Sequence, residues 1–307
     1  MNSRILIALV AFLLVASNFS VAQEKSKARD RSKLTKLEIR TEQRRYRQAP
    51  EGDLFLHLYY PSDWKQEDIR PAIVFFFGGG WKTGSHVQFE TQAKYFASRG
   101  LVAAAADYRI LSKHKTAPDQ SLQDAKSALR WVRMHARDLG VDANKIVASG
   151  GSSGGHLAAG AALLENFDSP DDSTKVSCKP NALVLFNPVL NLTLLPGRAL
   201  LDSKGNDITE SFSPTLNLSK SAPPAVIFYG TADKFLAQGE EYAAKANDLG
   251  IRADLYTAAG LSHGFFNQSP WTEVTAKKAD EFLASLGYLK GSPTIELPAN
   301  APRLEKR

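Results

Sequence analysis

Uninterrupted apolar runs and helical patterns alternate along most of the chain. The runs at 72–77 and 101–106 contain no polar position, which is typical of strands buried on both faces of a parallel sheet. At 121–139, by contrast, apolar residues recur every three or four positions, which indicates an amphipathic helix. Two of the helical patterns end at a glycine, Gly100 and Gly140. The alternation predicts an α/β fold.

The predicted elements follow one another at short intervals. Strands are expected at 37–46, 54–61, 72–77, 101–106, 146–149, 182–186, 225–229 and 253–256. Helices are expected at 89–98, 121–139, 156–164, 240–249 and 272–286. Strands that alternate with helices form a mostly parallel sheet covered by helices on both faces. Such sheets bind ligands at the carboxyl ends of their strands, so the residues after each strand are the place to look for chemistry.

The first 22 residues have the pattern of a signal peptide. Arg4 precedes twelve apolar residues at 5–16, and the small residues Ser20 and Ala22 predict cleavage before Gln23. The alternative is an uncleaved anchor, but twelve apolar residues are too few to cross a bilayer about 30 Å thick as a helix. The sequence therefore predicts a secreted or periplasmic protein with no stable membrane insertion after cleavage.

The net charge of +6 is concentrated near the N-terminus. Residues 24–47 hold ten lysines and arginines against four acids, which places the basic character in an N-terminal leader rather than in the folded body. Tyr46 is the one aromatic residue among these charges, whereas many nucleic-acid binders interleave several, so no nucleic-acid partner is predicted. The single cysteine, Cys178, excludes an intramolecular disulfide.

These features define the expected domains. They are a signal peptide at 1–22, a basic tail at 23–40, an α/β domain at 41–290 and a C-terminal tail at 291–307. The segment 187–221 breaks the rhythm of strands and helices because it is rich in Leu, Pro, Ser and Asn. It is either a lid or cap segment over a site or a long surface excursion, and the pattern does not decide between them.

The strongest chemical signal follows the strand at 146–149. The run 150–155 reads GGSSGG and precedes a helical pattern, as in the G-x-S-x-G turn that presents a nucleophilic serine between a strand and a helix. Two frames fit, one with Ser152 and one with Ser153 as the nucleophile, and spacing alone does not separate them. A phosphate-binding turn is the alternative, but the lysine of a P-loop is absent.

Three further signals stand after other strands. Gly78, Gly79 and Gly80 follow the apolar strand at 72–77, where consecutive glycines allow backbone N–H groups to face a developing oxyanion. Asp233 follows the strand at 225–229, and His263 follows the last strand. The order Ser, Asp, His and the placement of each residue after a strand favour a hydrolytic triad over isolated caps and polar surface residues.

The chain resembles the α/β-hydrolase superfamily, and within it the esterases and lipases related to hormone-sensitive lipase and to bacterial feruloyl and acetyl esterases. The resemblance covers about 53–289, and its motifs are FGGGW at 77–81, DYR at 107–109, GGSSGGH at 150–156, GTAD at 230–233 and HGF at 263–265. It implies Ser152 as the nucleophile, with Gly79, Gly80 and Ser153 as oxyanion donors. Phe77 stands where the related pattern often has a histidine, which puts the hydrogen bonding of that loop in question.

The resemblance implies an exported serine carboxylic-ester hydrolase with the triad Ser152, Asp233 and His263. Its substrates would be small esters or acetyl and feruloyl esters on polysaccharides, and no cofactor or metal is expected. The alternatives are a serine peptidase of the prolyl-oligopeptidase type and a non-catalytic binding protein on the same fold. The other histidines show no metal-ligand spacing, and structural ion pairs are expected among Asp107, Arg109 and Asp124.

Overall fold

One nine-stranded sheet runs through the part of the chain that the structure describes. The computed structural model describes residues 39–195, 197 and 199–307, and the strand order is β1-β2-β4-β3-β5-β6-β7-β8-β9. The strands from β4 through β3 and β5 to β8 are parallel, whereas β1, β2 and β9 are antiparallel to their neighbours. The mostly parallel sheet that the sequence predicts is confirmed.

The strands are buried most completely at the centre of the sheet. Strands β4, β6 and β7, most of β3 and the second half of β5 are buried, as their apolar runs require, whereas β1 at one edge is largely exposed. The bounds are β1 (Arg40–Ala49), β2 (Gly52–Tyr60), β3 (Arg70–Phe76), β4 (Val102–Ala106), β5 (Val141–Gly151), β6 (Ala182–Phe186), β7 (Ala225–Gly230), β8 (Ala253–Ala258) and β9 (Glu305–Lys306).

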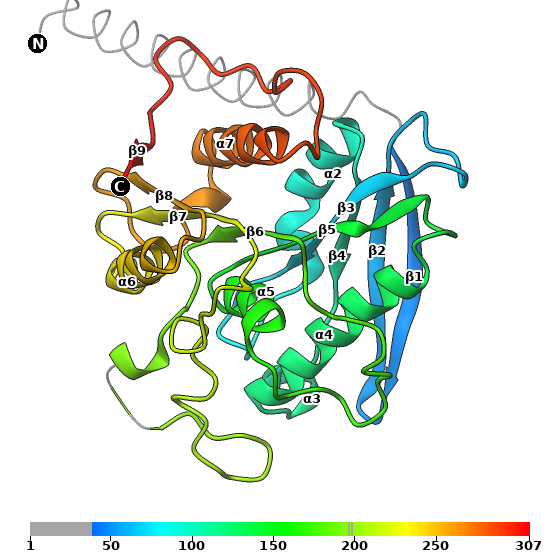
Figure 1. Cartoon of the computed structure of the whole chain (residues 1–307), viewed down its shortest axis with the longest axis vertical. Coiled ribbons are helices and arrows are strands. Elements are labelled where there is room, and N and C mark those ends of the chain that lie inside the picture. The colour runs from blue at the N-terminus through cyan, green and yellow to red at the C-terminus, as the bar shows by residue number, and fades with distance from the viewer. Residues whose placement is uncertain (1–38, 196, 198) are drawn as a thin grey trace, which may run out of the picture. The chain divides into compact units, whose positions relative to one another are not determined.

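Helices cover both faces of the sheet (Figure 1). The α-helices are α2 (Glu90–Ser98), α3 (Leu111–His114), α4 (Pro118–Met134), α5 (Ser153–Leu163), α6 (Leu236–Asp248) and α7 (Trp271–Ser285), and the short 3-10 helices are η1 (His86–Phe89), η2 (Leu192–Leu194) and η3 (Phe265–Asn267). One core cluster lies beneath α4, α5 and α6 and includes Leu122 and Tyr242. The other lies beneath α2 and α7 and includes Phe96 and Phe282.

The basic segment expected at 24–47 is not entirely a tail. Arg40, Arg44, Arg45 and Arg47 lie in β1, and the Arg47 side chain is mostly buried, with its Nε 3.3 Å from Oδ1 of Asp124. The strand predicted at 37–46 is thus present as β1 with both ends shifted by three residues, and the charges at 40–47 belong to the sheet rather than to a leader. The predicted signal peptide and most of the basic tail lie outside the described residues.

The C-terminal residues return to the sheet. Residues 291–307 are expected as a tail, but Glu305 and Lys306 form β9 and pair with Thr257 and Tyr256 of β8. Lys306 Nζ also lies 2.7 Å from Oδ1 of Asp254. The boundary expected at residue 290 therefore does not coincide with the edge of the sheet. No helix in the described part of the chain is long and apolar enough to span a bilayer.

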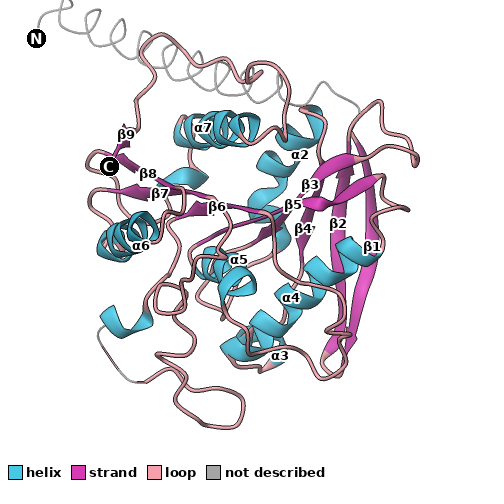
Figure 2. Cartoon of the chain, viewed as in Figure 1, coloured by secondary structure: helices cyan, strands magenta, loops and turns pink. Residues whose placement is uncertain are grey.

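The segment 187–221 runs mostly as loop between β6 and β7 (Figure 2). It is nevertheless anchored, because Phe212 and Ile208 are buried in the core cluster under α4, α5 and α6. Ser203 donates its N–H and Oγ–H to the two carboxylate oxygens of Asp119 in α4. The segment is therefore packed on the helical layer along much of its length.

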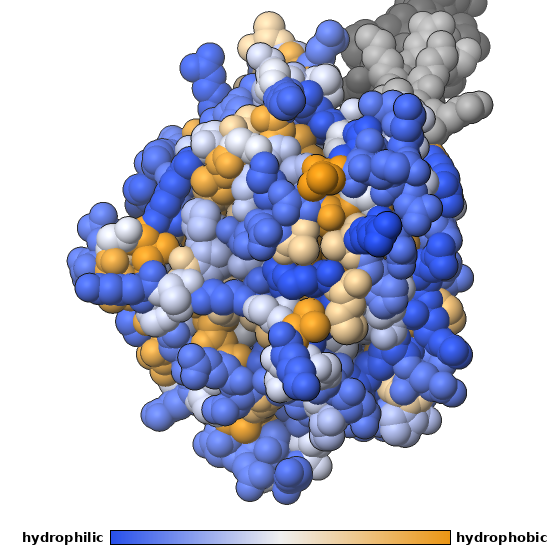
Figure 3. Space-filling model, turned by 45° about the vertical axis from the view of Figure 1, so that its right-hand side comes forward, coloured by the Kyte–Doolittle hydropathy of each residue, from blue (hydrophilic) through white to orange (hydrophobic). Residues whose placement is uncertain are grey.

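The surface shows no broad apolar region on the face drawn in Figure 3. Hydrophilic side chains prevail there, and hydrophobic ones form small separate spots. The exposed large hydrophobic residues come from different parts of the described chain, for example Ile69, Met134 and Leu216. Continuous apolar patches mark many protein or membrane interfaces, and Figure 3 shows only separate apolar spots on that face.

Candidate active site

Ser152 lies at the sharp turn between β5 and α5. Its φ of 54° and ψ of −119° fall outside the regions that most residues adopt, and its N–H donates to the Phe186 carbonyl at 2.9 Å. The turn brings α5 so close to β3 that a Cβ on Gly154 would lie 2.0 Å from the Phe76 carbonyl oxygen. Only glycine fits at 154, and the turn has the geometry of a nucleophile elbow.

Three side chains from separate loops form one hydrogen-bonded chain. The Oγ atom of Ser152 lies 2.9 Å from Nε2 of His263, and Nδ1 of His263 lies 2.8 Å from Oδ2 of Asp233. The Asp233 carboxylate is fully buried, whereas about a third of the His263 side chain, 32%, is exposed. The structure therefore brings together the three residues that the sequence predicts as a triad, at the carboxyl edge of β5, β7 and β8.

The buried carboxylate of Asp233 is held by two further donors. Asn187 Nδ2 donates to Oδ2 at 2.6 Å, and the N–H of Phe235 donates to Oδ1 at 2.9 Å. Asn187 Oδ1 in turn accepts from the N–H of Gly264, next to His263, at 3.3 Å. The motifs of the sequence do not single out Asn187, although its place directly after the strand at 182–186 is a usable signal.

The glycine loop after β3 lies beside the elbow. Gly79 and Gly80 have φ values of 130° and 64°, which a side chain would make costly. The N–H of Gly80 donates to Oγ of Ser153 at 2.8 Å, and for the N–H of Gly79 the described residues provide no acceptor. Gly79, Gly80 and Ser153 are therefore neighbours, but one of the three expected oxyanion donors is occupied by the Ser153 hydroxyl.

The glycine loop has Phe77 where related sequences often have a histidine, and other residues hold it in place. The Phe77 ring stacks on Tyr108 with ring centroids 4.0 Å apart, and the Tyr108 hydroxyl donates to the Phe77 carbonyl at 2.6 Å. The N–H of Gly78 donates to Oε1 of Gln88 at 2.6 Å, and Gln88 reaches Asn267 with its Nε2 at 3.2 Å. Nothing in the local pattern around Gln88 predicted this role.

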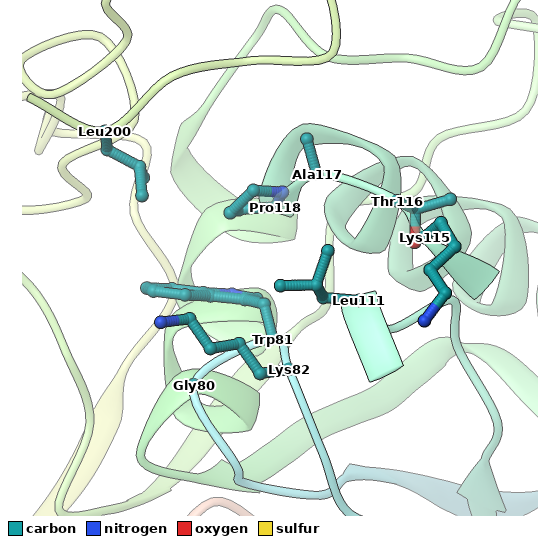
Figure 4. Close-up of a pocket in the computed structure, with 9 residues that line it drawn as sticks. All are labelled: Gly80, Trp81, Lys82, Leu111, Lys115, Thr116, Ala117, Pro118 and Leu200. Carbon is teal, nitrogen blue, oxygen red and sulfur yellow. The ribbon is translucent and has the colours of Figure 1, made fainter. Parts of the chain in front are cut away.

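A pocket of about 520 Å³ adjoins the glycine loop. Its lining is mainly apolar and includes Trp81, Leu111, Pro118 and Leu200, and Figure 4 shows the Trp81 ring facing Pro118 and Leu111. The segment 187–221 contributes Leu200, which lies on the side of the pocket away from Lys115 (Figure 4). The segment therefore forms one wall of the pocket.

The buried side chain of His156 packs against the Trp81 ring. The His156 ring meets the Trp81 ring edge-on, with centroids 5.1 Å apart, and its Nε2 donates to the Phe212 carbonyl at 2.7 Å. Burial lowers the pKa of His156 to about 4, despite the opposing effect of that hydrogen bond. His156 is therefore neutral near pH 7 and acts as a packing and hydrogen-bonding residue.

The expected ion pairs among Asp107, Arg109 and Asp124 form only in part. The Arg109 guanidinium donates to both carboxylate oxygens of Asp124 at 2.8 and 2.9 Å, and both side chains are buried. Asp107 lies instead beside His57 and His86, with which it shares two contacts of 3.2 Å. The sequence does not predict this cluster, because its members are far apart in the chain.

Known proteins that resemble the chain are esterases. A family model described as BD-FAE matches residues 56–245. Carboxylesterase NlhH of Mycobacterium tuberculosis is 25% identical over 267 residues, which are 81% of this chain and 82% of that protein. The match to the family model covers more than half of the chain and includes the elbow, the glycine loop and Asp233.

Solved structures of one bacterial esterase match more closely. Thermogutta terrifontis esterase 2 phosphonylated by cyclosarin shares 43% identity at a TM-score of 0.78 and covers 82% of this chain and 96% of its own. The same esterase with butyrate bound shares 42% identity at a TM-score of 0.76, with coverage of 82% and 96%. The chain therefore belongs to the BD-FAE family of α/β-hydrolase-fold esterases and is a serine hydrolase of the carboxylesterase type.

Proposed function

We propose that the chain hydrolyses carboxylic esters with Ser152 as nucleophile, His263 as general base and Asp233 as the residue that orients His263. The observation that carries this proposal is the position of the His263 ring, 2.9 Å from the Ser152 Oγ and 2.8 Å from the Asp233 carboxylate. A base at this distance can take the serine proton as Oγ attacks the ester carbonyl. The buried carboxylate stabilises the imidazolium that forms.

The oxyanion of the tetrahedral intermediate would be held by the N–H groups of Gly79, Gly80 and Ser153. The N–H of Gly80 donates to the Ser153 hydroxyl in the free enzyme, so it would exchange this neutral acceptor for the charged oxygen as the reaction proceeds. Hydrogen bonds to an ionised acceptor are roughly twice as strong as neutral ones, which favours the exchange. His263 then protonates the leaving alcohol, and water releases the acid from Ser152.

The substrate is proposed to carry an acetyl or feruloyl group, either on a small molecule or on a polysaccharide. The pocket beside Gly80 is apolar and of a size that suits a small acyl or aromatic group. The butyrate named for the Thermogutta esterase supports small acyl groups. The catalytic body is proposed to comprise 41–290 together with the C-terminal residues that return to the sheet as β9, with 187–221 as a wall over the pocket.

Export is also proposed. It rests on the apolar run at 5–16 and the small residues before Gln23. Expression in a Gram-negative bacterium followed by N-terminal sequencing should yield a periplasmic chain that begins at Gln23. A chain recovered from the cytoplasm with residues 1–22 intact would contradict export.

Two serine variants test the catalytic assignment. Ser152→Ala should lower kcat for p-nitrophenyl acetate by about 10⁴-fold or more, because the nucleophile is lost. Ser153→Ala keeps its backbone N–H and should change kcat less than about tenfold. A fluorophosphonate probe should label Ser153→Ala but not Ser152→Ala. The reverse result would move the nucleophile to Ser153, and a panel with methyl ferulate and longer acyl esters would rank the substrates.

A further inference from the structure

The glycine loop and the loop that carries His263 are joined by the side chains of two amide residues. The N–H of Gly78 donates to Oε1 of Gln88 at 2.6 Å, and Nε2 of Gln88 donates to Oδ1 of Asn267 at 3.2 Å. Nδ2 of Asn267 donates in turn to the Gly264 carbonyl at 3.0 Å. Because Gly264 directly follows His263, three consecutive hydrogen bonds link the glycine loop to the loop of the proposed base.

The chemistry of these groups fixes the direction of both amides. If the Gln88 amide were reversed, its NH₂ group would face the N–H of Gly78, and two donors cannot form a hydrogen bond. With Oε1 on Gly78, the NH₂ group of Gln88 donates to Asn267, whose own NH₂ group then faces the Gly264 carbonyl. The two bonds of Gln88 need an acceptor and a donor at the end of one side chain. An amide has both, whereas a carboxylate only accepts and a thioether or hydrocarbon chain offers no N–H or O–H.

Gly78 lies where a small displacement would alter the oxyanion site. Its carbonyl belongs to the same planar peptide group as the N–H of Gly79, which is one of the proposed oxyanion donors. A Cβ on Gly78 would lie 2.9 Å from the Gly151 carbonyl oxygen and 3.3 Å from Cβ of Ser152, so the glycine loop touches the elbow. The hydrogen bond to Gln88 therefore holds Gly78 against the elbow and sets the direction of the Gly79 N–H.

The turn that carries Gln88 is itself fixed to the body of the enzyme. Phe89, at the end of η1, is fully buried and stacks on Phe266 of η3 with ring centroids 5.7 Å apart. At the start of η1, Nδ1 of His86 lies 3.2 Å from Oδ1 of Asp107, which follows β4. The packing of the two phenyl rings should therefore keep η1 beside η3 when the amide bonds are removed.

We propose that Gln88 is a positioning residue for ester hydrolysis, which holds the oxyanion donors and the base in a fixed relation through Asn267. The role rests on the proposed function, because Gln88 acts through Gly79 and His263 and carries no reacting atom itself. Loss of a whole oxyanion donor lowers kcat by about 10²- to 10³-fold in other hydrolases. A donor that is kept but less well aimed should cost less than that.

Gln88→Met removes both hydrogen bonds with little change in the size of the side chain. In the full-length enzyme, kcat for p-nitrophenyl acetate should fall about 10- to 100-fold and KM should stay within about threefold, because the oxyanion exists only in the transition state and intermediate. The Ki of a trifluoromethyl ketone, whose adduct with Ser152 carries the oxyanion, should rise by the same factor as kcat/KM falls. A fall in kcat with an unchanged Ki would overturn the proposal, as would an unchanged kcat.

Asn181→Leu is the matched control. The Asn181 amide oxygen also accepts a backbone N–H, that of Ile146 at 3.1 Å, but it does so where the buried part of β5 begins, away from the carboxyl edge. This variant should lower the Tm and leave both kcat and the Ki of the ketone within about twofold. Equal losses of kcat in Gln88→Met and Asn181→Leu would show that Gln88 contributes only general stability and would contradict a positioning role.

A double variant tests whether the two amides act as one link. Asn267→Ala alone should lower kcat, and the double variant Gln88→Met/Asn267→Ala should stay within about twofold of Gln88→Met, because the link is already broken. Fold-losses that multiply, or an unchanged kcat in Asn267→Ala, would show that the link to the His263 loop has no role. Failure of the proposed function would appear instead as full activity in Ser152→Ala, so the two proposals can fail separately.

Discussion

Asn187 shows how much of the site depends on a residue that carries no reacting atom. Its amide donates to the Asp233 carboxylate at 2.6 Å, and its φ of 44° is one that asparagine and aspartate tolerate. Asn187→Asp keeps the shape and replaces the donor by a second carboxylate. Loss of a hydrogen bond to a charged group costs about 1.5–3 kcal/mol, so kcat for a short-chain ester should fall about 10- to 100-fold.

Asn191→Asp is the matched control for this variant. The Asn191 amide also donates to a carboxylate, that of Glu241, at 2.8 Å, but it makes no contact with the Ser152–His263–Asp233 chain. Its substitution should lower the Tm and leave kcat within about twofold. Equal losses of kcat in the two variants would mean that Asn187 acts through general stability. A rise in KM alone for Asn187→Asp would also contradict a role in orienting Asp233.

The buried His156 predicts a dependence of stability on pH. Its pKa is lowered by burial from 6.5 to about 4 in the folded chain. Between these values the unfolded chain binds a proton that the folded chain does not, so the stabilisation is complete above pH 6.5 and is lost as the pH falls. From pH 6.5 to 4.5 the wild type should lose about 2 kcal/mol more unfolding free energy than His156→Gln.

Urea unfolding at four pH values across this range measures the difference. The glutamine amide can donate to the Phe212 carbonyl as His156 does, so the variant should stay folded at pH 7.5. Carboxylates elsewhere contribute equally to both proteins and cancel in the comparison. Parallel curves for wild type and variant would show that His156 is protonated in the folded chain at these pH values.

At the scale of elements, buried strands were the easiest to predict and their ends the hardest. The strand predicted at 182–186 has the same first and last residues as β6, because this run of five apolar residues fits only a buried strand. By contrast, the strand predicted at 146–149 extends over Val141–Gly151. Its first half contains Asp142, Asn144 and Lys145, which lie in an irregular stretch between the pairs Arg70–Val141 and Ala72–Ile146 and therefore show no apolar run.

The C-terminal strand β9 provides a prediction at this scale. A chain that ends at residue 302 loses the pairing with β8 and the contact between Lys306 and Asp254. Lys306 is 60% exposed, and such pairs contribute little. The unfolding free energy should fall by about 1 kcal/mol and the Tm by about 2–4 °C. At temperatures below the Tm of both the full-length and the truncated chain, the rate of ester hydrolysis should be unchanged.

Comparison with a chain that ends at residue 290 separates the effect of strand pairing between β8 and β9 from the effect of core packing by residues 291–302. The shorter chain also loses Ile295, which is buried against the core under α2 and α7. Burial of such a side chain contributes about 2 kcal/mol, so this chain should be clearly less stable than the one that ends at 302. Equal Tm values for the two chains would show that residues 291–302 add nothing. A full-length Lys306→Ala variant isolates the ion pair.

At the scale of the whole molecule, the sequence predicted which residues follow which strands but not which side chains meet. Ser152, Asp233 and His263 could be proposed because a parallel sheet brings the carboxyl ends of its strands to one edge. The hydroxyl of Ser153 as acceptor for Gly80, and the cluster of His57, His86 and Asp107, depend on side-chain directions that periodicity does not encode. Contacts between loops therefore required the structure.

Within the described residues, the nine-stranded sheet and both core clusters are built from residues 39–307. Strand β1 begins at Arg40, and Ile39 packs against the core cluster under α2 and α7. A chain that begins at residue 39 should therefore have a Tm within about 2 °C of one that begins at Gln23, and the same kcat/KM for a neutral ester. The basic residues removed should affect only anionic substrates, through attraction that salt screens. A Tm lower by more than about 5 °C, or a loss of activity on neutral esters, would show that residues 23–38 belong to the folded enzyme.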